Sequence, residues 1–172
     1  MKISVFIATS LDGYIARLDG GIDWLPQTPE PHGYDEFMVT VDALLIGRKT
    51  YETVLGFGGW AYGTKPVFVL STRPLAPAPK QAIVKHLSGE PETIVAQLTS
   101  RGLKHVYLDG GLTIQRFLRA GLVDRMIITR IPVLIGSGIP LFGPTNGDIH
   151  FTHVVTRSYP SGLVQSEYLA AR

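Results

Sequence analysis

Short apolar runs rich in β-branched residues recur along the chain, each followed by glycine or other turn-forming residues. They lie at residues 3–8, 43–47, 66–70, 82–86, 105–108 and 125–131. Runs of this length without a polar face are typical of strands that are buried on both sides, as in a parallel sheet. The runs therefore restrict the chain to folds in which both faces of a sheet are covered.

The segments between these runs carry helix signals. Pro91 suits a first helical position and Gly102 suits a left-handed cap, which predicts a helix between them. Further helices are expected over residues 34–41, directly after Gly47, and over residues 113–120. The alternation of strands and helices favours an α/β fold with helices on both faces of the sheet.

Glycine and proline recur through residues 132–147, which predicts a long loop. Two stretches, 151–157 and 163–168, then flank the turn 158–162 and predict an antiparallel hairpin. The chain, residues 1–172, is therefore expected to form a single domain. Its expected class is α/β, a three-layer αβα sandwich whose mixed central sheet is mostly parallel and ends in an antiparallel C-terminal hairpin.

Composition excludes several classes of protein. The sequence has no cysteine, which excludes disulfides, thiolate metal sites and a thiol nucleophile, and its five histidines are too scattered to predict a metal site. The 16 basic residues are spread along the chain and the formal net charge is only +2, so a nucleic-acid partner is not expected. No apolar stretch is long enough to cross a membrane, and a cytoplasmic location is expected.

The end of the second run carries residues suited to an anion. Gly47, Arg48, Lys49 and Thr50 lie between a buried strand and a predicted helix start. Free backbone N–H groups and the positive end of the helix dipole meet at such a corner. The two cations would add to the attraction, so this corner favours a phosphate.

Two other runs end in a similar way. Gly110 and Gly111 lead from a strand into a predicted helix, so bare backbone amides can closely approach a pyrophosphate. Ser71, Thr72 and Arg73 follow the third run and offer donors suited to a phosphate monoester. Three such strand ends on one sheet suggest a dinucleotide.

Each of these signals also has an ordinary structural interpretation. Glycine pairs are common at turns, and Arg48, Lys49 and Arg73 could be solvated surface charges. Their coincidence at the carboxyl ends of strands, where α/β sheets place their ligand crevice, favours the functional interpretation. The sequence has no GxGxxG after the first run and no GxxxxGK[ST], so neither a Rossmann domain nor a P-loop ATPase is favoured.

Several motifs follow one another in a distinctive order: IATSLDGYIA at 7–16, DWL at 23–25, IGRKTYE at 46–52, LSTR at 70–73 and DGG at 109–111. This series resembles the dihydrofolate-reductase-like superfamily. A last block, PVLIGSGIPLF at 132–142, is similar to the subgroup that contains the reductase C-terminal domain of riboflavin biosynthesis and its stand-alone bacterial relatives. The resemblance spans nearly the whole chain and implies an NADPH-dependent reductase.

The resemblance also implies a role for each matched residue on the cofactor side. Ala8 and Ile15 would line the nicotinamide pocket. The residues implied to bind the phosphate and nucleotide parts of NADPH are Gly47, Arg48, Lys49, Thr50, Leu70, Ser71, Thr72, Arg73, Gly110, Gly111, Leu112 and Thr113.

Fewer residues are available for the substrate side. Trp24 and Phe57 are expected to wall the substrate pocket. The resemblance places Phe37 on the helix that faces the substrate in dihydrofolate reductases, and Thr129 at a strand position that faces the ligand. A threonine within a strand is equally consistent with a purely structural role.

The proton donor stays open among Asp12, Asp35 and Glu36. In dihydrofolate reductases a carboxylate lies four residues before a helical phenylalanine, and the matching position before Phe37 is Gly33. Asp35 and Glu36 are therefore out of register, which argues against a folate substrate. As acids in a first helical turn, they also have a structural explanation.

The predicted activity is hydride transfer from NADPH to a small polar substrate, with reduction of 5-amino-6-(5-phosphoribosylamino)uracil in riboflavin biosynthesis as the closest comparison. The alternatives are a dihydrofolate reductase and a non-catalytic nucleotide- or small-ligand-binding protein of the same fold. A zinc deaminase half is not expected without cysteine. The resemblance implies a homodimer, to which Gly136, Ser137, Gly138 and the apolar residues 131–135 would contribute.

Overall fold

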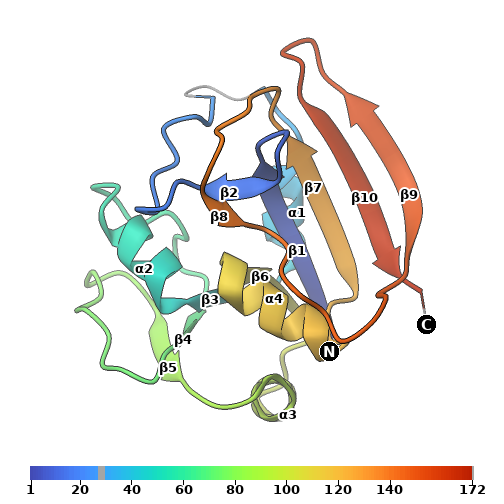
Figure 1. The fold of residues 1–172 in the computed structure, drawn as a ribbon. Helices are drawn as coiled ribbons and strands as arrows, with labels where there is room; N and C mark the ends of the chain where they lie inside the picture. The colour runs from blue at the N-terminus through green and yellow to red at the C-terminus, as the bar shows by residue number, and fades with distance from the viewer. Residues whose placement is uncertain (27–29, 172) are drawn as a thin grey trace.

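The structure is a computed structural model that describes residues 1–26 and 30–171 (Figure 1). The elements follow in the order β1 (Lys2–Thr9), β2 (Tyr14–Ala16), α1 (Tyr34–Thr40), β3 (Ala43–Gly47), α2 (Arg48–Leu55), β4 (Val67–Leu70), β5 (Val84–Leu87), α3 (Pro91–Ser100), β6 (His105–Asp109), α4 (Gly111–Arg119), β7 (Arg125–Arg130), β8 (Ile139–Pro140), β9 (Phe151–Ser158) and β10 (Val164–Ala170). Each predicted strand and helix is present, with bounds that differ by a few residues at most.

The described residues form one eight-stranded sheet in the order β5-β4-β3-β6-β1-β7-β10-β9. The pairs from β5 to β7 are parallel, while β10 runs antiparallel to both β7 and β9. This arrangement confirms the predicted mixed sheet with its antiparallel C-terminal hairpin.

Helices cover both faces of the parallel part of the sheet. On one face, Ile94 of α3 and Phe117 of α4 belong to a core that also contains Val5 of β1. On the other face, Phe37 of α1 and Tyr51 of α2 pack into a second core. In Figure 1, α4 lies in front of the sheet and α1 behind it. The three predicted layers are therefore confirmed.

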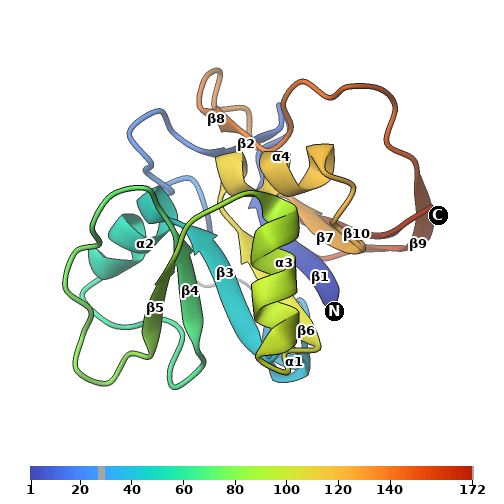
Figure 2. The same cartoon turned by 90° about the horizontal axis from the view of Figure 1, so that it is seen from below.

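The last two strands extend beyond the helices. Figure 2 shows β9 and β10 at the side of the molecule, past α3 and α4. The burial pattern agrees, since most residues of β9 are partly or fully exposed. No helix among the described residues has the length and apolar character needed to cross a membrane.

A small ribbon was missed by the sequence analysis. Residues 132–147 were predicted as loop, but β8 within them pairs antiparallel with β2. Leu141 N–H donates to the Gly13 carbonyl at 3.0 Å, and Leu11 N–H donates to the Val133 carbonyl at 2.8 Å. A Cβ at Gly138 would collide with the Ala16 carbonyl oxygen, so the close approach needs a glycine. The ribbon lies over the carboxyl end of β1 (Figure 1).

Candidate functional site

The three predicted strand ends lie side by side at one edge of the sheet. Gly47 of β3 is in register with Leu70 of β4, and Ile46 of β3 is in register with Asp109 of β6. Because these strands are parallel neighbours, their carboxyl ends open toward the same side. The predicted convergence is confirmed as geometry, and ligand binding there stays a prediction.

Two of the corners interlock through glycines and threonines. A Cβ at Gly47 would lie 2.7 Å from Thr113 Oγ1 of α4, and a Cβ at Gly110 would lie 2.6 Å from Thr50 Oγ1 of α2. Gly110 also has φ 100°, which other residues rarely adopt. The two helix starts can therefore approach each other only with glycine at both strand ends. Together they form a cradle in which the backbone at Gly47 and Gly110 carries no side chain of its own and packs against Thr113 and Thr50.

The second glycine of the pair faces the β2–β8 ribbon. A Cβ at Gly111 would lie 3.0 Å from Ile15 Cδ1 and 3.1 Å from Ile139 Cγ2. Ile15, predicted to line the nicotinamide pocket, is thus next to the cradle, while Ala8 is the next-to-last residue of β1. Leu112 is 67% exposed at the start of α4. The ribbon forms a wall on this side of the strand ends.

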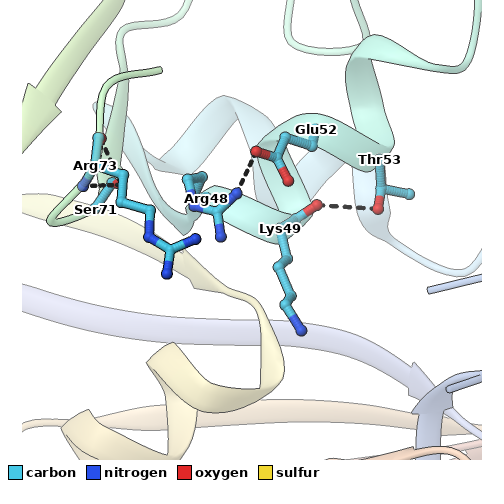
Figure 3. A network of polar contacts seen from close by, with 6 residues as sticks. All are labelled: Arg48, Lys49, Glu52, Thr53, Ser71 and Arg73. Carbon is cyan, nitrogen blue, oxygen red and sulfur yellow. Dashed lines mark hydrogen bonds and ion pairs between the residues drawn. The ribbon is translucent and has the colours of Figure 1, made fainter. Parts of the chain in front are cut away.

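Cationic side chains gather at the corner between β3 and β4 (Figure 3). Arg48 pairs with Glu52 one turn along α2, whereas neither Lys49 nor Arg73 forms an ion pair within the described residues. Ser71 Oγ accepts from Arg73 N–H at 2.9 Å and donates to the Arg73 carbonyl at 2.7 Å. This small turn fixes the backbone after β4, next to the start of α2. Thr72 is exposed on it.

Asp109 is a functional candidate that sequence reasoning missed. In the sequence it is only the first residue of the motif DGG at 109–111, but in the structure it ends β6 and its carboxyl group is buried. Burial raises its pKa from 3.8 to about 6, although Gly110 N–H donates to its Oδ1 at 2.7 Å. Because residues two apart in a strand share a face, Asp109 lies on the same side of the sheet as Tyr107. That alternation was the available signal in the sequence.

The carboxyl group of Asp109 acts electrostatically on three tyrosines. The negative charge of Asp109 acts on Tyr34, Tyr62 and Tyr107, and burial is the main cause of the raised pKa of each phenol. For Tyr34 the pKa rises to about 12. The Tyr107 hydroxyl donates to the Phe6 carbonyl at 2.8 Å. Asp109 therefore shares the α1–α2 side of the sheet with three neutral phenols.

Two residues predicted on the substrate side are core residues. Phe37 is 4% exposed, with ring centroids 5.2 Å from Phe6 and 5.1 Å from Tyr107. Thr129 is 2% exposed, and its hydroxyl accepts from Gln165 Nε2 at 2.9 Å. Both side chains pack against neighbouring strands and helices, and their roles toward a substrate stay predictions.

The three candidate proton donors are not brought together. Asp12 accepts from Ser10 Oγ at 2.6 Å and from Gly136 N–H at 2.8 Å, and the Ser10 hydrogen bond lowers its pKa. Because its carboxylate is ionised and accepts hydrogen bonds that hold the loop before β8, Asp12 is a poor proton donor. Asp35 and Glu36 are exposed in the first turn of α1. In that same turn, Tyr34 lies between Gly33 and these acids, and the charges of Asp109 and Asp35 add to the burial that raises its pKa.

The two remaining predicted substrate residues are placed differently. Trp24 is partly buried in the loop after β2, and its Nε1 has no hydrogen-bond partner among the described residues. This loop lies against α2, since a Cβ at Gly20 would be 3.5 Å from Thr53 Oγ1. Phe57 is 52% exposed just beyond α2. Trp24 fits a site wall better than Phe57, because it presents a buried donor that lacks an acceptor.

The mixed sheet, its antiparallel C-terminal pair and the glycine corners together define a reductase-type fold of the dihydrofolate-reductase-like class. Within that class, the chain belongs to the RibD C-terminal domain family, which matches residues 1–165.

Relatives and solved structures agree with this placement. The uncharacterised protein YwjB of Bacillus subtilis is 32% identical over 99% of this chain and 98% of its own. A Shewanella sp. PV-4 crystal structure whose name links it to riboflavin biosynthesis is 42% identical, with a TM-score of 0.91 and complete coverage of both chains. Enterococcus faecalis dihydrofolate reductase complexed with NADP(H) shares the fold at 17% identity, with a TM-score of 0.70 over 99% of this chain and 97% of that one.

Proposed function

We propose that this protein is an NADPH-dependent reductase that transfers hydride to a small polar substrate. The observation that carries the proposal is the convergence of three anion-favouring strand ends at one sheet edge, with Gly47 and Gly110 leaving two helix starts open. A dinucleotide with several phosphates matches this distribution of backbone donors and cations. When bound, the reduced nicotinamide supplies the hydride.

The residues at the cradle fit such a cofactor. The Gly47 and Gly110 positions have no room for a Cβ beside Thr113 and Thr50, so a ligand at this edge can come close to the backbone and to the two threonine hydroxyls. Arg73, which is exposed and lacks an ion pair among the described residues, is the group we assign to the 2′-phosphate that distinguishes NADPH from NADH. Lys49 would add positive charge at the start of α2.

Asp109 is the group that we assign to supply the substrate proton. With a pKa of about 6, a fraction of its carboxyl groups is protonated near neutral pH. A general acid is most effective when its pKa lies close to the working pH. The hydrogen bond from Gly110 N–H fixes one carboxyl oxygen, which leaves the other for the substrate.

Cofactor titration tests the proposal directly. NADPH and NADH are titrated by calorimetry against the wild type and Arg73→Ala. Loss of a hydrogen bond to a charged group should weaken NADPH binding by roughly tenfold or more and leave NADH binding nearly unchanged. Arg119→Ala, a charge removal on exposed α4 surface, is the matched control. If the wild type fails to bind NADPH at micromolar concentrations, the proposal is wrong.

Turnover is tested by following NADPH oxidation with candidate substrates. The family relationship puts 5-amino-6-(5-phosphoribosylamino)uracil first in the panel, followed by dihydrofolate. NADPH that binds but is not oxidised by any pterin, aminouracil or quinone would support the alternative of a non-catalytic binding protein.

We further propose that the protein is a homodimer. Beyond α4, Val164 at the start of β10 is 38% exposed, and Phe142 in the loop after β8 is 51% exposed. Beside them is a hollow of about 550 Å³ lined in part by Phe142, Phe151 and Ile149. A second copy would present the same surface, as two-fold association requires. In analytical ultracentrifugation, Phe142→Glu should yield monomers, whereas Leu18→Glu, at a 74% exposed site elsewhere, should not.

A further inference from the structure

The turn after β4 is tied to β5 by an imidazole ring. His86 donates from Nε2 to the Ser71 carbonyl at 2.7 Å, since a carbonyl oxygen can only accept. The Ser71 N–H also donates to the Leu87 carbonyl at 3.0 Å. The regular pairing of β4 with β5 ends one residue earlier, at Leu70. Ser71 is therefore held to β5 by both its N–H and its carbonyl group.

Ser71 passes this constraint on to Arg73. The Ser71 hydroxyl accepts from the Arg73 N–H and donates to the Arg73 carbonyl (Figure 3). A serine hydroxyl has a single proton, and this turn uses it. Pro74 follows, and the residue before a proline is limited mainly to extended conformations. The backbone that carries the Arg73 side chain is therefore fixed from both directions along the chain.

The far end of this segment is anchored on α2. Leu75 is partly buried against the core that contains Tyr51, and the Tyr51 hydroxyl donates to the Ala76 carbonyl at 3.0 Å. Between the two anchors, Thr72 and Arg73 are exposed. A segment held at both ends presents its exposed side chains at a defined place, which lowers the entropic cost of binding a ligand.

His86 lies on the side of the sheet that α2 covers. It is in register with Val69, which belongs to the core that Tyr51 of α2 helps to form. Lys85 lies instead on the opposite side, where its Nζ is 5.7 Å from the centroid of the Phe68 ring. His86 is therefore the polar residue of β5 on the same side as the cationic corner at the start of α2.

We propose that His86 is a positioning residue for recognition of the 2′-phosphate of NADPH: by holding the Ser71 carbonyl, it orients Arg73 toward that phosphate. The inference rests on the proposed reductase function and adds a residue that determines cofactor specificity through another side chain. An arginine whose backbone is already ordered loses less entropy when it binds. NADH lacks the 2′-phosphate and gains nothing from this order.

Calorimetric titration of NADPH and NADH tests this role in the wild type, His86→Ala and His86→Gln. The alanine variant should bind NADPH roughly three- to tenfold more weakly and NADH within about twofold of the wild type. Glutamine carries an amide N–H that can reach the same carbonyl and should restore most of the NADPH affinity. Because His86 and the turn are exposed, Tm should hardly change in either variant.

Lys85→Ala is the matched control. It removes the neighbouring polar side chain of β5, and because Lys85 lies over Phe68 on the other side of the sheet, the ratio of the two affinities should not change. A double-mutant cycle with Arg73→Ala separates positioning from direct contact with the cofactor. If His86 acts through Arg73, adding His86→Ala to Arg73→Ala should cause no further loss of NADPH affinity.

Five results would overturn the inference: unchanged NADPH affinity in His86→Ala, an equal loss for NADH, a loss that persists without Arg73, a His86→Gln variant no better than His86→Ala, or a marked fall in Tm of His86→Ala, which would indicate a structural role. Failure of the wild type to bind NADPH would refute the proposed function and this inference with it. Normal NADPH binding by the wild type and by His86→Ala would refute only the role of His86.

Discussion

Replacing Asp109 by asparagine should make the protein more stable and less active. Burial raises the pKa of the Asp109 carboxyl group from 3.8 to about 6. A difference of this size corresponds to roughly 3 kcal/mol at 25 °C between the two protonation states. Asparagine has nearly the same shape, carries no charge at any pH, and keeps an Oδ1 that can accept from Gly110 N–H.

The sign of the effect follows from the direction of the pKa shift. Because the folded protein holds the Asp109 proton more tightly than the unfolded chain, acidification from about pH 6 to pH 4 stabilises the folded state. Above pH 6 the buried carboxylate is ionised and destabilises the fold by up to about 3 kcal/mol. The free energy of unfolding of the asparagine variant should exceed that of the wild type by this amount at pH 8 and should equal it below about pH 4.

Urea and thermal unfolding at pH 4, 6 and 8 measure this difference. For a chain of this size, about 3 kcal/mol corresponds to a rise in Tm of roughly 6–12 °C at pH 8. Asp19→Asn is the matched control, because Asp19 Oδ1 accepts from Gly21 N–H at 2.8 Å on the exposed surface. An Asp109→Asn variant no more stable than wild type at pH 8, or a gain that persists at pH 4, would refute the reasoning. Turnover should fall with the loss of the proton donor.

Three further substitutions test the cradle and the hydrogen bonds that Asp12 accepts from the loop before β8. Gly110→Ala should lower Tm and NADPH affinity well beyond Gly121→Ala, since both have positive φ but only Gly110 meets a threonine hydroxyl, at 2.6 Å. Gly47→Ala should lower the free energy of unfolding in urea by roughly 1–3 kcal/mol, because its new methyl group would lie 2.7 Å from Thr113 Oγ1 and overpack the site. Adding Thr113→Ala removes that hydroxyl and should recover part of the lost stability. Asp12→Ala should speed hydrogen–deuterium exchange of the amides at 135–136, which it accepts from, without altering exchange in β3.

The strand pattern was predictable because burial on both faces leaves a strong trace in sequence. The run at 43–47, for example, is buried along β3 except at its last residue. The β2–β8 ribbon left no such trace, since β8 has two residues, one of them Pro140, and its pairing depends on the backbone approach at Gly138. Strands that short carry no periodicity, and their partner cannot be deduced from composition.

The candidate site was predictable only where backbone chemistry defines it. A strand-to-helix turn with a bare backbone amide requires glycine, which the sequence places at 47 and 110. The two turns come together because their strands pair in parallel. The acid was not predictable in this way. In the sequence Asp109 resembles an ordinary turn residue, and the burial that raises the pKa of its carboxyl group arises only once distant parts of the chain fold together.

The position of Asp109 couples the two halves of the site. Asp109 and Gly110 are consecutive, so the buried acid and the glycine at the cradle share one peptide unit. Gly110 N–H donates to Asp109 Oδ1, so a change in the backbone at Gly110 also moves the carboxyl group. Cofactor binding at the cradle should therefore alter the pKa of Asp109. If the pH dependence of Tm between pH 4 and 8 is the same with and without saturating NADP⁺, the two halves of the site are not coupled through this peptide.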